Sequence, residues 1–406
     1  MSPRRVVITG IGILSCLGND RDQVLDALRA GRSGIELIPE RKALGFRSGL
    51  GGRIKGLEPP DVPKRNLRLM GPGSYLAVHA ARQATADARL KPEQVASDRT
   101  GIVIGNLGNM HDIYTQSRKF ADRTEKLGGT AYQRVMGCSV SANLSVLLKT
   151  RGYSLTVTAA CATGATAIGL GTQLIRTGVQ DVCLAGGVQE DTWEAFCHFD
   201  ALDAFSVREA EPTKASRPFD RQRDGLVPSA GCGLVVLEEL EQAQRRGARI
   251  YGEVAGYAFT SDGQDMTAPS GEGSVRSMRG ALAEAGLRAD EVDYVNAHAT
   301  STAVGDVAEA QAIAAVFGAR PWVSSTKSMT GHEQAAAGSS EVIYTLLMMA
   351  HGFVAPSINV EELDPRCEGI RLVANEAIAG RIEVAASNSF GFGGVNTCVI
   401  LRRVPE

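Results

Sequence analysis

Short runs of apolar and β-branched residues alternate along the chain with longer segments whose apolar positions recur at helical spacing. The short runs predict strands, and the longer segments predict helices that pack on them. Strands interleaved with helices indicate an α/β protein with buried parallel strands. In the first part of the chain the strand-like runs lie at residues 5–12, 100–105, 154–157, 181–187 and 233–238, and a buried helix is expected at 165–176.

The second part of the chain repeats this order, which predicts two similar halves at residues 1–249 and 250–406. A length of 406 residues also exceeds what one hydrophobic core usually supports. Each half contains a strand, a turn of small residues and a buried helix, at 154–176 and at 323–349, and the two turns are expected to face one central site. Further runs at 250–257, 293–296 and 396–401 correspond in order to those at 5–12, 100–105 and 233–238.

Two kinds of feature interrupt the pattern. The polar segments 106–150 and 188–230 are long connections, which usually carry lids, interfaces or binding surfaces. The opening strand is expected to end in a turn at Gly10 and Gly12. This Gly-x-Gly pair lacks the third glycine of a dinucleotide-binding fingerprint, so NAD binding is not expected.

Composition narrows the class of protein. A formal net charge of −2 argues against nucleic acid as the main partner. No apolar run reaches transmembrane length, and the first five residues lead directly into a strand, so neither a membrane partner nor a signal segment is expected. The eight cysteines include no Cys-x-x-Cys pair, which predicts reduced thiols in the cytoplasm without a disulfide framework or a zinc site.

Cys161 is the strongest candidate for a nucleophile. It lies between the strand-like run 154–157 and the helix 165–176, with alanine on both sides. A thiol there would face the positive end of the helix dipole, which favours the thiolate. The alternative is a buried structural thiol, the interpretation we give to the other seven cysteines.

Two of the six histidines lie in turns of small residues. His298 follows the run 293–296, and His332 precedes the second buried helix, near the position that Cys161 holds in the first half. Two imidazoles and a thiol in one cavity would polarise a thioester carbonyl and stabilise an enolate. Either histidine alone could instead be an ordinary core or surface residue. Lys327, among Ser and Thr, is expected to be partly buried and paired with a carboxylate.

Two further groups accompany these residues. Asp306 and Glu309 are three positions apart and are expected on one side of a helix start, where they could equally favour the helix dipole. The glycine-rich loop 389–394 contains Phe390 and Phe392. It is either a plain tight turn or a hinge that places a backbone N–H in an oxyanion hole and moves an aromatic gate.

The ordered segments VVITGIG, AACATGA, NAHATST, STKSMTGH and SNSFGFGG resemble the β-ketoacyl-[acyl-carrier-protein] synthases of the thiolase-like superfamily over the whole chain. Length and the segments KASRPFDRQRDG and YAFTSDGQDM are most similar to the type I synthases of bacterial type II fatty-acid synthesis. The resemblance implies a duplicated, five-layered αβαβα fold. It implies an acyltransferase that condenses a Cys-bound acyl group with malonyl-acyl-carrier protein in fatty-acid elongation. The alternative is a ketosynthase subunit of a polyketide or polyene pathway, paired with a chain-length-factor-like partner.

The resemblance also implies roles for single residues. Cys161 would be acylated, His298 and His332 would promote decarboxylation and hold the enolate oxygen, and Lys327 would support them, with Asp306 and Glu309 in its network. The N–H groups of Cys161 and Phe392 would form the oxyanion hole, with Phe392 and Phe390 at the gate. Thr300 and Thr302 would contact the phosphopantetheine arm of the carrier protein.

Partners and ions are implied in the same way. Catalysis would need no cofactor, and the protein would be a homodimer or a heterodimer with a related subunit. The acidic carrier protein would dock on Arg65, Arg68, Arg123 and Lys126. A structural Na⁺ or K⁺ would be held by Asn296, Ala297, Glu309, Glu341, Ser387 and Asn388.

The chain departs from the family pattern at several places and leaves other functions open. The departures are Ala299, Ala303, Glu333 to Ala335, Val395 and the segment 106–111. A thiolase acting on coenzyme A is one alternative, although thiolases pair the nucleophile with one histidine and a second cysteine near the C-terminus. An inactive structural partner in a heterodimer is another.

Overall fold

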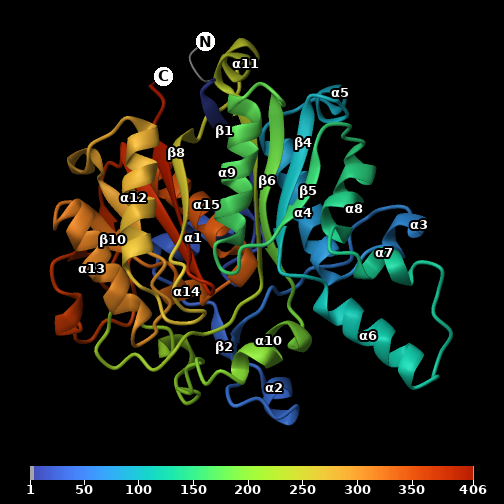
Figure 1. Ribbon diagram of the computed structural model, residues 1–406, viewed down its shortest axis with the longest axis horizontal. Coiled ribbons are helices and arrows are strands. Elements are labelled where there is room, and N and C mark those ends of the chain that lie inside the picture. Colours follow the sequence, from blue (N-terminus) through green and yellow to red (C-terminus); the bar gives the residue numbers. More distant parts are fainter. Residues whose placement is uncertain (1–3, 406) are drawn as a thin grey trace.

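An 11-stranded sheet forms the centre of the computed structural model, which describes residues 4–405 (Figure 1). Residues 1–3 and 406, the outer ends of the two expected halves, lie outside the described residues. Across the sheet the strands are β12 (Arg371–Leu372), β10 (Trp322–Ser324), β9 (Tyr294–Asn296), β14 (Val384–Gly391), β15 (Val395–Arg402), β8 (Gly252–Ser261), β1 (Val6–Leu14), β7 (Gly231–Glu239), β6 (Val182–Gln189), β4 (Thr100–Asn106) and β5 (Ser154–Val157).

The two parts of the sheet have the same pairing pattern. From β1 outward, β7 and β6 are antiparallel to their inner neighbours, whereas β4 and β5 are parallel to theirs. From β8 outward, β15 and β14 are antiparallel, whereas β9 and β10 are parallel. The predicted repeat is therefore confirmed, and β14 supplies the counterpart of β6. The domain boundary expected between residues 249 and 250 stays a prediction.

A short contact joins the two parts into one sheet. Val7 pairs with Glu253 and Ile8 with Gly252 in antiparallel register. The Glu253 carboxylate accepts hydrogen bonds from Arg5 at 2.8 and 2.7 Å and from Arg402 at 2.8 Å. These charge-assisted bonds link the first strand of the chain to the last.

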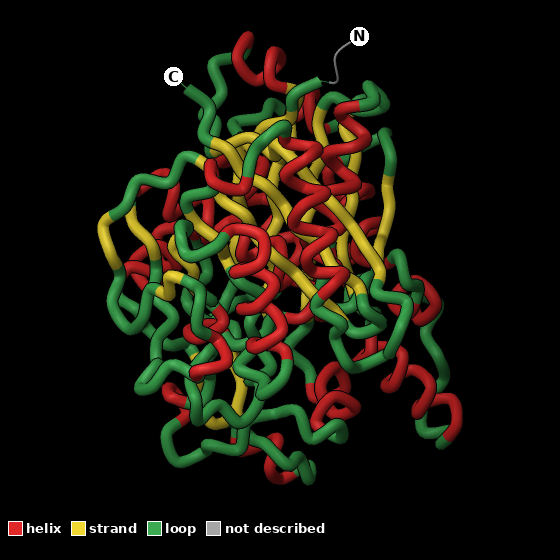
Figure 2. The backbone as a smooth tube through the Cα atoms, turned by 60° about the vertical axis from the view of Figure 1, so that its left-hand side comes forward, coloured by secondary structure: helices red, strands yellow, loops and turns green. Residues whose placement is uncertain are grey.

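Helices form three layers around and between the two parts of the sheet (Figures 1 and 2). The central layer is α9 (Thr163–Arg176) with α15 (Ala337–His351), which contact each other and strands of both parts. On the outside, α4 (Pro72–Asp87) and α8 (Ser139–Leu148) pack on the first part, and α12 (Glu272–Ala285) with α13 (Gly305–Phe317) covers the second. This order is the five-layered αβαβα arrangement that the resemblance implies.

The remaining elements are short and mostly peripheral. Two small sheets pair β2 (Ile35–Leu37) with β3 (Leu50–Gly52) and β11 (Phe353–Val354) with β13 (Ile378–Ala379). The other helices are α1 (Arg21–Arg29), α2 (Pro39–Ala43), α3 (Lys64–Leu67), α5 (Pro92–Val95), α6 (Met110–Ala121), α7 (Ala131–Val135), α10 (Trp193–Asp200), α11 (Leu240–Arg245) and α14 (Lys327–Thr330).

Two expectations about strands are wrong. The segment 154–157 was expected to be buried, but β5 is the outermost strand of the sheet, and Leu155 is 39% exposed. The turn expected at Gly10 and Gly12 does not form, because β1 continues through both residues to Leu14. A Cβ at Gly10 would lie 2.2 Å from the Ala84 carbonyl oxygen, and one at Gly12 would lie 1.9 Å from that of Ala80. The glycines therefore let α4 lie directly against the strand.

Of the two polar segments, 188–230 reaches the central cavity and 106–150 does not. The segment 106–150 contains α6, α7 and α8, and α6 projects from the body at the lower right of Figure 1. The segment 188–230 contains α10 and supplies Phe199 and Leu226 to the central cavity.

Within residues 4–405, none of the helices combines the length and apolar character that crossing a membrane requires.

Candidate active site

Cys161 lies in a tight turn between β5 and α9. Ala160 before it has a φ of +46°, in the left-handed region that alanine rarely adopts. The Thr163 hydroxyl stabilises the turn, because it accepts from the Ala159 N–H at 2.7 Å and donates to the Ala160 carbonyl at 2.6 Å. Gly391 of β14 packs against this turn, where a Cβ would lie 2.9 Å from the Cys161 nitrogen. Cys161 is thus held between the two halves of the chain.

The resting thiol of Cys161 is neutral. Burial raises its pKa to about 11, although the Lys327 ammonium and the backbone N–H groups of Phe392 and Cys161 act in the opposite direction. The expectation that the helix dipole favours a thiolate is therefore wrong for the free enzyme, because desolvation of the sulfur outweighs the favourable dipoles and charge. The same two N–H groups face the sulfur, where an oxyanion hole was expected.

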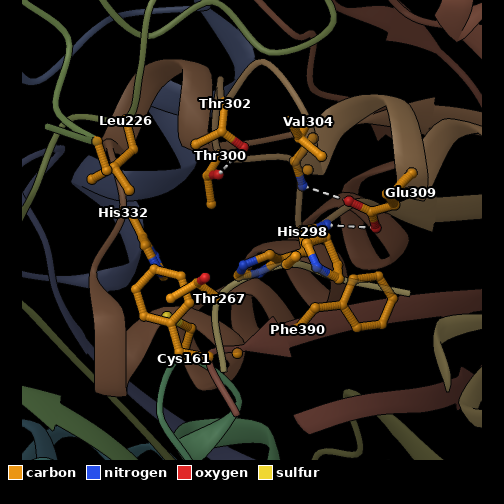
Figure 3. A pocket seen from close by; sticks show the side chains of 18 of the residues that line it. Cys161, Leu226, Thr267, His298, Thr300, Thr302, Val304, Glu309, His332 and Phe390 are labelled. Carbon is orange, nitrogen blue, oxygen red and sulfur yellow. Dashed lines mark hydrogen bonds between the residues drawn. The ribbon is translucent and has the colours of Figure 1, made fainter. Parts of the chain in front are cut away.

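His298 and His332 face each other beside the thiol (Figure 3). Their ring centroids are 5.3 Å apart and the rings are nearly perpendicular, at 86°. Burial, together with the positive charge of Lys327, holds the pKa of both imidazoles well below the usual range. Both rings are therefore neutral near pH 7 and present one N–H each.

The turn after His332 determines which ring nitrogen carries the proton. The Gln334 backbone N–H donates to His332 Nδ1 at 3.3 Å, so Nδ1 is an acceptor. The proton must then be on Nε2, which has no hydrogen-bond partner in the structure and belongs to a side chain that lines the cavity. His332 therefore presents a free N–H donor to whatever occupies the cavity.

Lys327 is paired with a carboxylate, as predicted, but it is fully buried and not partly buried. Its side chain is 2% exposed, and its ammonium forms an ion pair with the Glu341 carboxylate of α15. The helix 337–351 is otherwise apolar at its centre, so a carboxylate there is the signal that could have identified this partner. Burial raises the pKa of Glu341 to about 7, and Lys327 acts in the opposite direction.

Asp306 and Glu309 both lie on α13 but face different groups. Glu309 accepts from the backbone N–H groups of His298 at 2.8 Å and Ala299 at 2.6 Å, and so holds the His298 turn. Asp306 accepts instead from the Phe219 and Thr302 N–H groups, at 2.9 and 3.1 Å. The structure therefore places Glu309 beside the histidines and Asp306 under the Thr302 turn, and it pairs Lys327 with neither.

One cavity of about 380 Å³ lies among these elements; Glu309 lines it, whereas Asp306 and Lys327 do not. Cys161, His298 and His332 lie in its wall, together with Thr300 and Thr302, whose hydroxyls are 3.3 Å apart. Figure 3 shows the five side chains around a common space. The cavity is lined mainly by apolar groups, as expected for a site that accepts an acyl thioester.

The expected loop 389–394 is shorter in the structure, because β14 continues through Phe390 to Gly391; Phe392 is the first residue of the turn that connects β14 to β15. Phe390 packs on His298 with ring centroids 5.9 Å apart. Phe392 is 37% exposed and stacks on Phe199 of α10 at 5.3 Å. The sequence analysis missed Phe199 and also Met266, 72% exposed at the edge of the cavity, because neither belongs to a recognisable motif.

Several oxygens near the site lack hydrogen-bond partners. Nowhere in residues 4–405 do three or more His, Cys, Asp or Glu side chains form a group suited to a metal ion. The predicted cation residues nevertheless include four buried oxygens without a partner, namely Asn296 Oδ1, Glu341 Oε2, Ser387 Oγ and Asn388 Oδ1. Amide, hydroxyl and carboxylate oxygens suit a hard cation, so this donor set fits Na⁺ or K⁺.

The four predicted docking residues are exposed in two places. Arg65 lies in α3 and Arg68 directly follows it. Arg123 and Lys126 lie in the loop between α6 and α7. All four are exposed, and both segments lie on the right-hand side of Figure 1.

Comparisons of the amino-acid sequence with known proteins find relatives over the whole length of the chain. Residues 3–243 match the family model of the β-ketoacyl synthase N-terminal domain, and residues 251–361 match that of the C-terminal domain. The 3-oxoacyl-[acyl-carrier-protein] synthase 1 of Haemophilus influenzae is 46% identical, covering 98% of this chain and 99% of the relative. The Escherichia coli K12 protein of that name is 44% identical, covering 99% and 100%.

Solved structures of ketosynthases also superimpose on this chain over nearly its whole length. A β-ketoacyl synthase from Burkholderia phymatum superimposes with a TM-score of 0.95 at 38% identity, covering 99% of this chain and 100% of that one. An ishigamide ketosynthase/chain length factor gives 0.92 at 34% identity, with both chains fully covered. The ketosynthase complex AntDE:AntF, which includes a type II polyketide acyl carrier protein, gives 0.90 at 30% identity, again with full coverage of both chains.

Proposed function

The chain belongs to the β-ketoacyl synthase family, and we propose that it condenses a Cys161-bound acyl group with malonyl-acyl-carrier protein during fatty-acid elongation. The observation that carries the proposal is the convergence of one thiol and two neutral imidazoles on a single apolar cavity. The thiol comes from the first half of the chain and the imidazoles come from the second. This combination supplies a nucleophile and two proton donors without any organic cofactor.

In the first step, Cys161 takes the acyl group from the carrier thioester. The sulfur attacks the carbonyl carbon, the bond to the phosphopantetheine sulfur breaks, and the released thiol carries away the proton that Cys161 loses. Because the resting pKa is about 11, the thiol proton must leave as the new bond forms. The N–H groups of Cys161 and Phe392 would stabilise the tetrahedral oxyanion.

In the second step, the malonyl group loses CO₂ and becomes an enolate. The electron pair of the broken C–C bond moves into the thioester, and its oxygen accepts hydrogen bonds from His332 Nε2–H and from His298. The enolate carbon then attacks the acyl carbonyl on Cys161, and the C–S bond breaks. The Cys161 sulfur takes up one proton from solvent, which balances the charge that the malonyl carboxylate brought. Apolar walls exclude water from the carbanion.

Fatty-acid elongation is favoured over a polyketide or polyene pathway. The two relatives named 3-oxoacyl-[acyl-carrier-protein] synthase 1 are 46% and 44% identical to this chain. The ishigamide and AntDE ketosynthases are 34% and 30% identical. A thiolase acting on coenzyme A is disfavoured as well, because Cys161 is the one cysteine among the described residues that line the cavity.

A carrier protein and a second copy of the chain are the proposed partners. Arg65, Arg68, Arg123 and Lys126 offer exposed positive charge to an acidic carrier. For a homodimer, the unpaired edge of β5 is the natural contact, since a sheet edge with exposed apolar residues invites pairing. Tyr153 is 49% and Leu155 39% exposed there.

The proposed location is the cytoplasm, where thiols stay reduced, because all eight cysteines are free.

A monovalent cation would be structural. The four unpartnered oxygens of Asn296, Glu341, Ser387 and Asn388 would hold it, with Glu309 and the Ala297 carbonyl as further ligands. Bound there, it would supply positive charge that stabilises the buried carboxylates of the site. The histidine chemistry itself does not require it.

The test is condensation by the purified protein. Acyl- and malonyl-carrier protein should give a β-ketoacyl product and one CO₂ per product, and intact-mass analysis should find the acyl group on the wild-type chain. A Cys161→Ala variant that still condenses would refute the proposal, as would equal turnover with coenzyme A thioesters alone. Cys197→Ala is the matched control, because Cys197 lies outside the cavity and should be dispensable. Failure of Cys161 to acylate would indicate an inactive structural subunit.

A further inference from the structure

Glu333 is a buried carboxylate next to His332 that the proposed mechanism does not use. It is 2% exposed and does not line the cavity, so it lies behind the catalytic turn. Its two carboxylate oxygens are 3.2 and 3.4 Å from the Tyr344 hydroxyl of α15. Burial raises the pKa of Glu333 to about 7, and in either protonation state the carboxyl group has an oxygen that can accept from that hydroxyl, which also lies 3.1 Å from Ser15 Oγ.

The first half of the chain makes room for this side chain. Gly231, at the start of β7, faces the carboxyl group, and a Cβ there would lie 2.7 Å from its carbon. Ser15 directly follows β1. The Glu333 side chain therefore extends from the turn of the second half toward the start of β7 and the end of β1, where these two strands pair with each other. Burying a carboxylate is costly, so a position of this kind requires a compensating interaction.

Before Glu333, the His332 turn is held by the Ser229 hydroxyl, which donates to the Thr330 carbonyl at 2.5 Å, and by two backbone hydrogen bonds. The His332 N–H donates to the Val227 carbonyl at 2.7 Å, and its carbonyl accepts from the Ser229 N–H at 3.0 Å. After Glu333 the chain enters a strained position, since Gln334 has a φ of +44°. The Gln334 N–H is the group that donates to His332 Nδ1.

We propose that Glu333 is a positioning residue for His332. Held by Tyr344, it anchors the peptide between residues 333 and 334, so that the Gln334 N–H keeps the histidine proton on Nε2, directed into the cavity. The inference rests on the proposed condensation, because it assigns a consequence to the orientation of His332. It predicts an effect on the step that uses the His332 N–H, and none on acylation of Cys161.

Three variants test the role. Glu333→Gln retains an oxygen that accepts from Tyr344, Glu333→Ala removes it, and Tyr344→Phe removes the donor while leaving Glu333 in place. Each is assayed for acylation of Cys161 by intact mass and for CO₂ release from malonyl-carrier protein. In protein labelled with ¹⁵N-histidine, the ring nitrogens of His332, assigned with a His332→Ala variant, report its tautomer and the Nδ1 hydrogen bond.

Glu333→Ala and Tyr344→Phe should lower kcat for decarboxylation by about tenfold to a hundredfold at unchanged KM. Acylation should stay at the wild-type rate, and the ¹⁵N signals of His332 should shift. Glu333→Gln should retain most of the activity and the wild-type signals. Unchanged kcat and signals in Tyr344→Phe would overturn the inference, as would a loss in Glu333→Gln as deep as in Glu333→Ala. The wild-type protein is measured alongside the variants for acylation, CO₂ release and formation of the β-ketoacyl product, so failure of the proposed function would be recognised separately.

Discussion

The substitution Gly391→Ala adds a single methyl group, and we expect it to slow the acylation of Cys161 strongly. The backbone of Gly391 does not have a positive φ, so the substitution introduces no conformational strain. The added methyl group would lie 2.9 Å from the Cys161 nitrogen, 3.0 Å from Ala160 Cβ and 3.2 Å from the Ala159 carbonyl oxygen. Ordinary contacts begin at 3.4 Å, so the turn of the nucleophile must move by about 0.5 Å.

The displaced groups include both proposed oxyanion donors, since Phe392 follows Gly391 and the Cys161 N–H is the nearest neighbour. Loss of one such donor typically costs about a hundredfold to a thousandfold in rate, or about 3–4 kcal/mol in the transition state. Overpacking of this kind costs about 1–3 kcal/mol in stability. We therefore expect an acylation rate constant at least about a hundredfold below wild type, in a protein that is still folded at 25 °C.

The assay is single-turnover acylation followed by intact mass, with chemical denaturation to measure the free energy of unfolding. Gly73→Ala is the matched control. A methyl group there meets nothing closer than 3.7 Å, and the residue lies inside α4, where alanine is favoured over glycine. Wild-type acylation by Gly391→Ala would refute the packing of β14 against the nucleophile turn.

Four further predictions follow from the site and its surroundings. Lys327→Met should lower the free energy of unfolding by about 3–5 kcal/mol, because it leaves the Glu341 carboxylate buried without a partner. The double variant Lys327→Met/Glu341→Gln should recover part of this lost stability, and urea titration measures both. His332→Ala should retain acylation, measured by intact mass, and lose CO₂ release by a factor of about a hundred or more. Burial raises the pKa of Glu190 to about 7, so the folded state binds this proton more tightly than the unfolded state does, and the free energy of unfolding falls as the pH rises from 4.5 to 7. Denaturation at pH 5 and pH 8 should show this difference in the wild type, and it should be smaller by up to about 3 kcal/mol in Glu190→Gln. Arg68→Glu should raise KM for the carrier protein about tenfold at low salt with kcat unchanged, and a salt-independent KM in the wild type would contradict the docking role.

The sequence predicted the repeat and the catalytic turns because both are local patterns. Strand–turn–helix order is encoded by neighbouring residues, and it placed Cys161 and His332 at equivalent turns. Burial of β5 could not be predicted in this way, because an apolar run has the same composition at the centre and at the edge of a sheet. The role of Gly10 also depended on a distant contact, since only the position of α4 shows why the strand needs glycine there.

Predictions of charge state also depended on contacts between residues that are far apart in the sequence. The helix dipole suggested a thiolate at Cys161, but the pKa rises to about 11 because both halves of the chain bury the sulfur. The partner of Lys327 was expected to be a carboxylate, and the identity of Glu341 required the packing of α15. Sequence reasoning named the candidate residues of the site, whereas their charge states depend on how the two halves of the chain pack around them.

The packing of Gly391 and Phe392 against Cys161 also has a consequence for synthesis of the protein on the ribosome. Residues 161 and 391 are separated by enough chain that translation needs about 10–50 s to pass from one to the other. Until residue 391 has been made, β14 cannot pack against the Cys161 turn, so we expect the sulfur to be more exposed than the 8% of the finished protein. Burial also raises the pKa of this thiol, and oxidants react with the thiolate. We therefore expect Cys161 to be oxidised more slowly in the finished fold than in an incomplete chain.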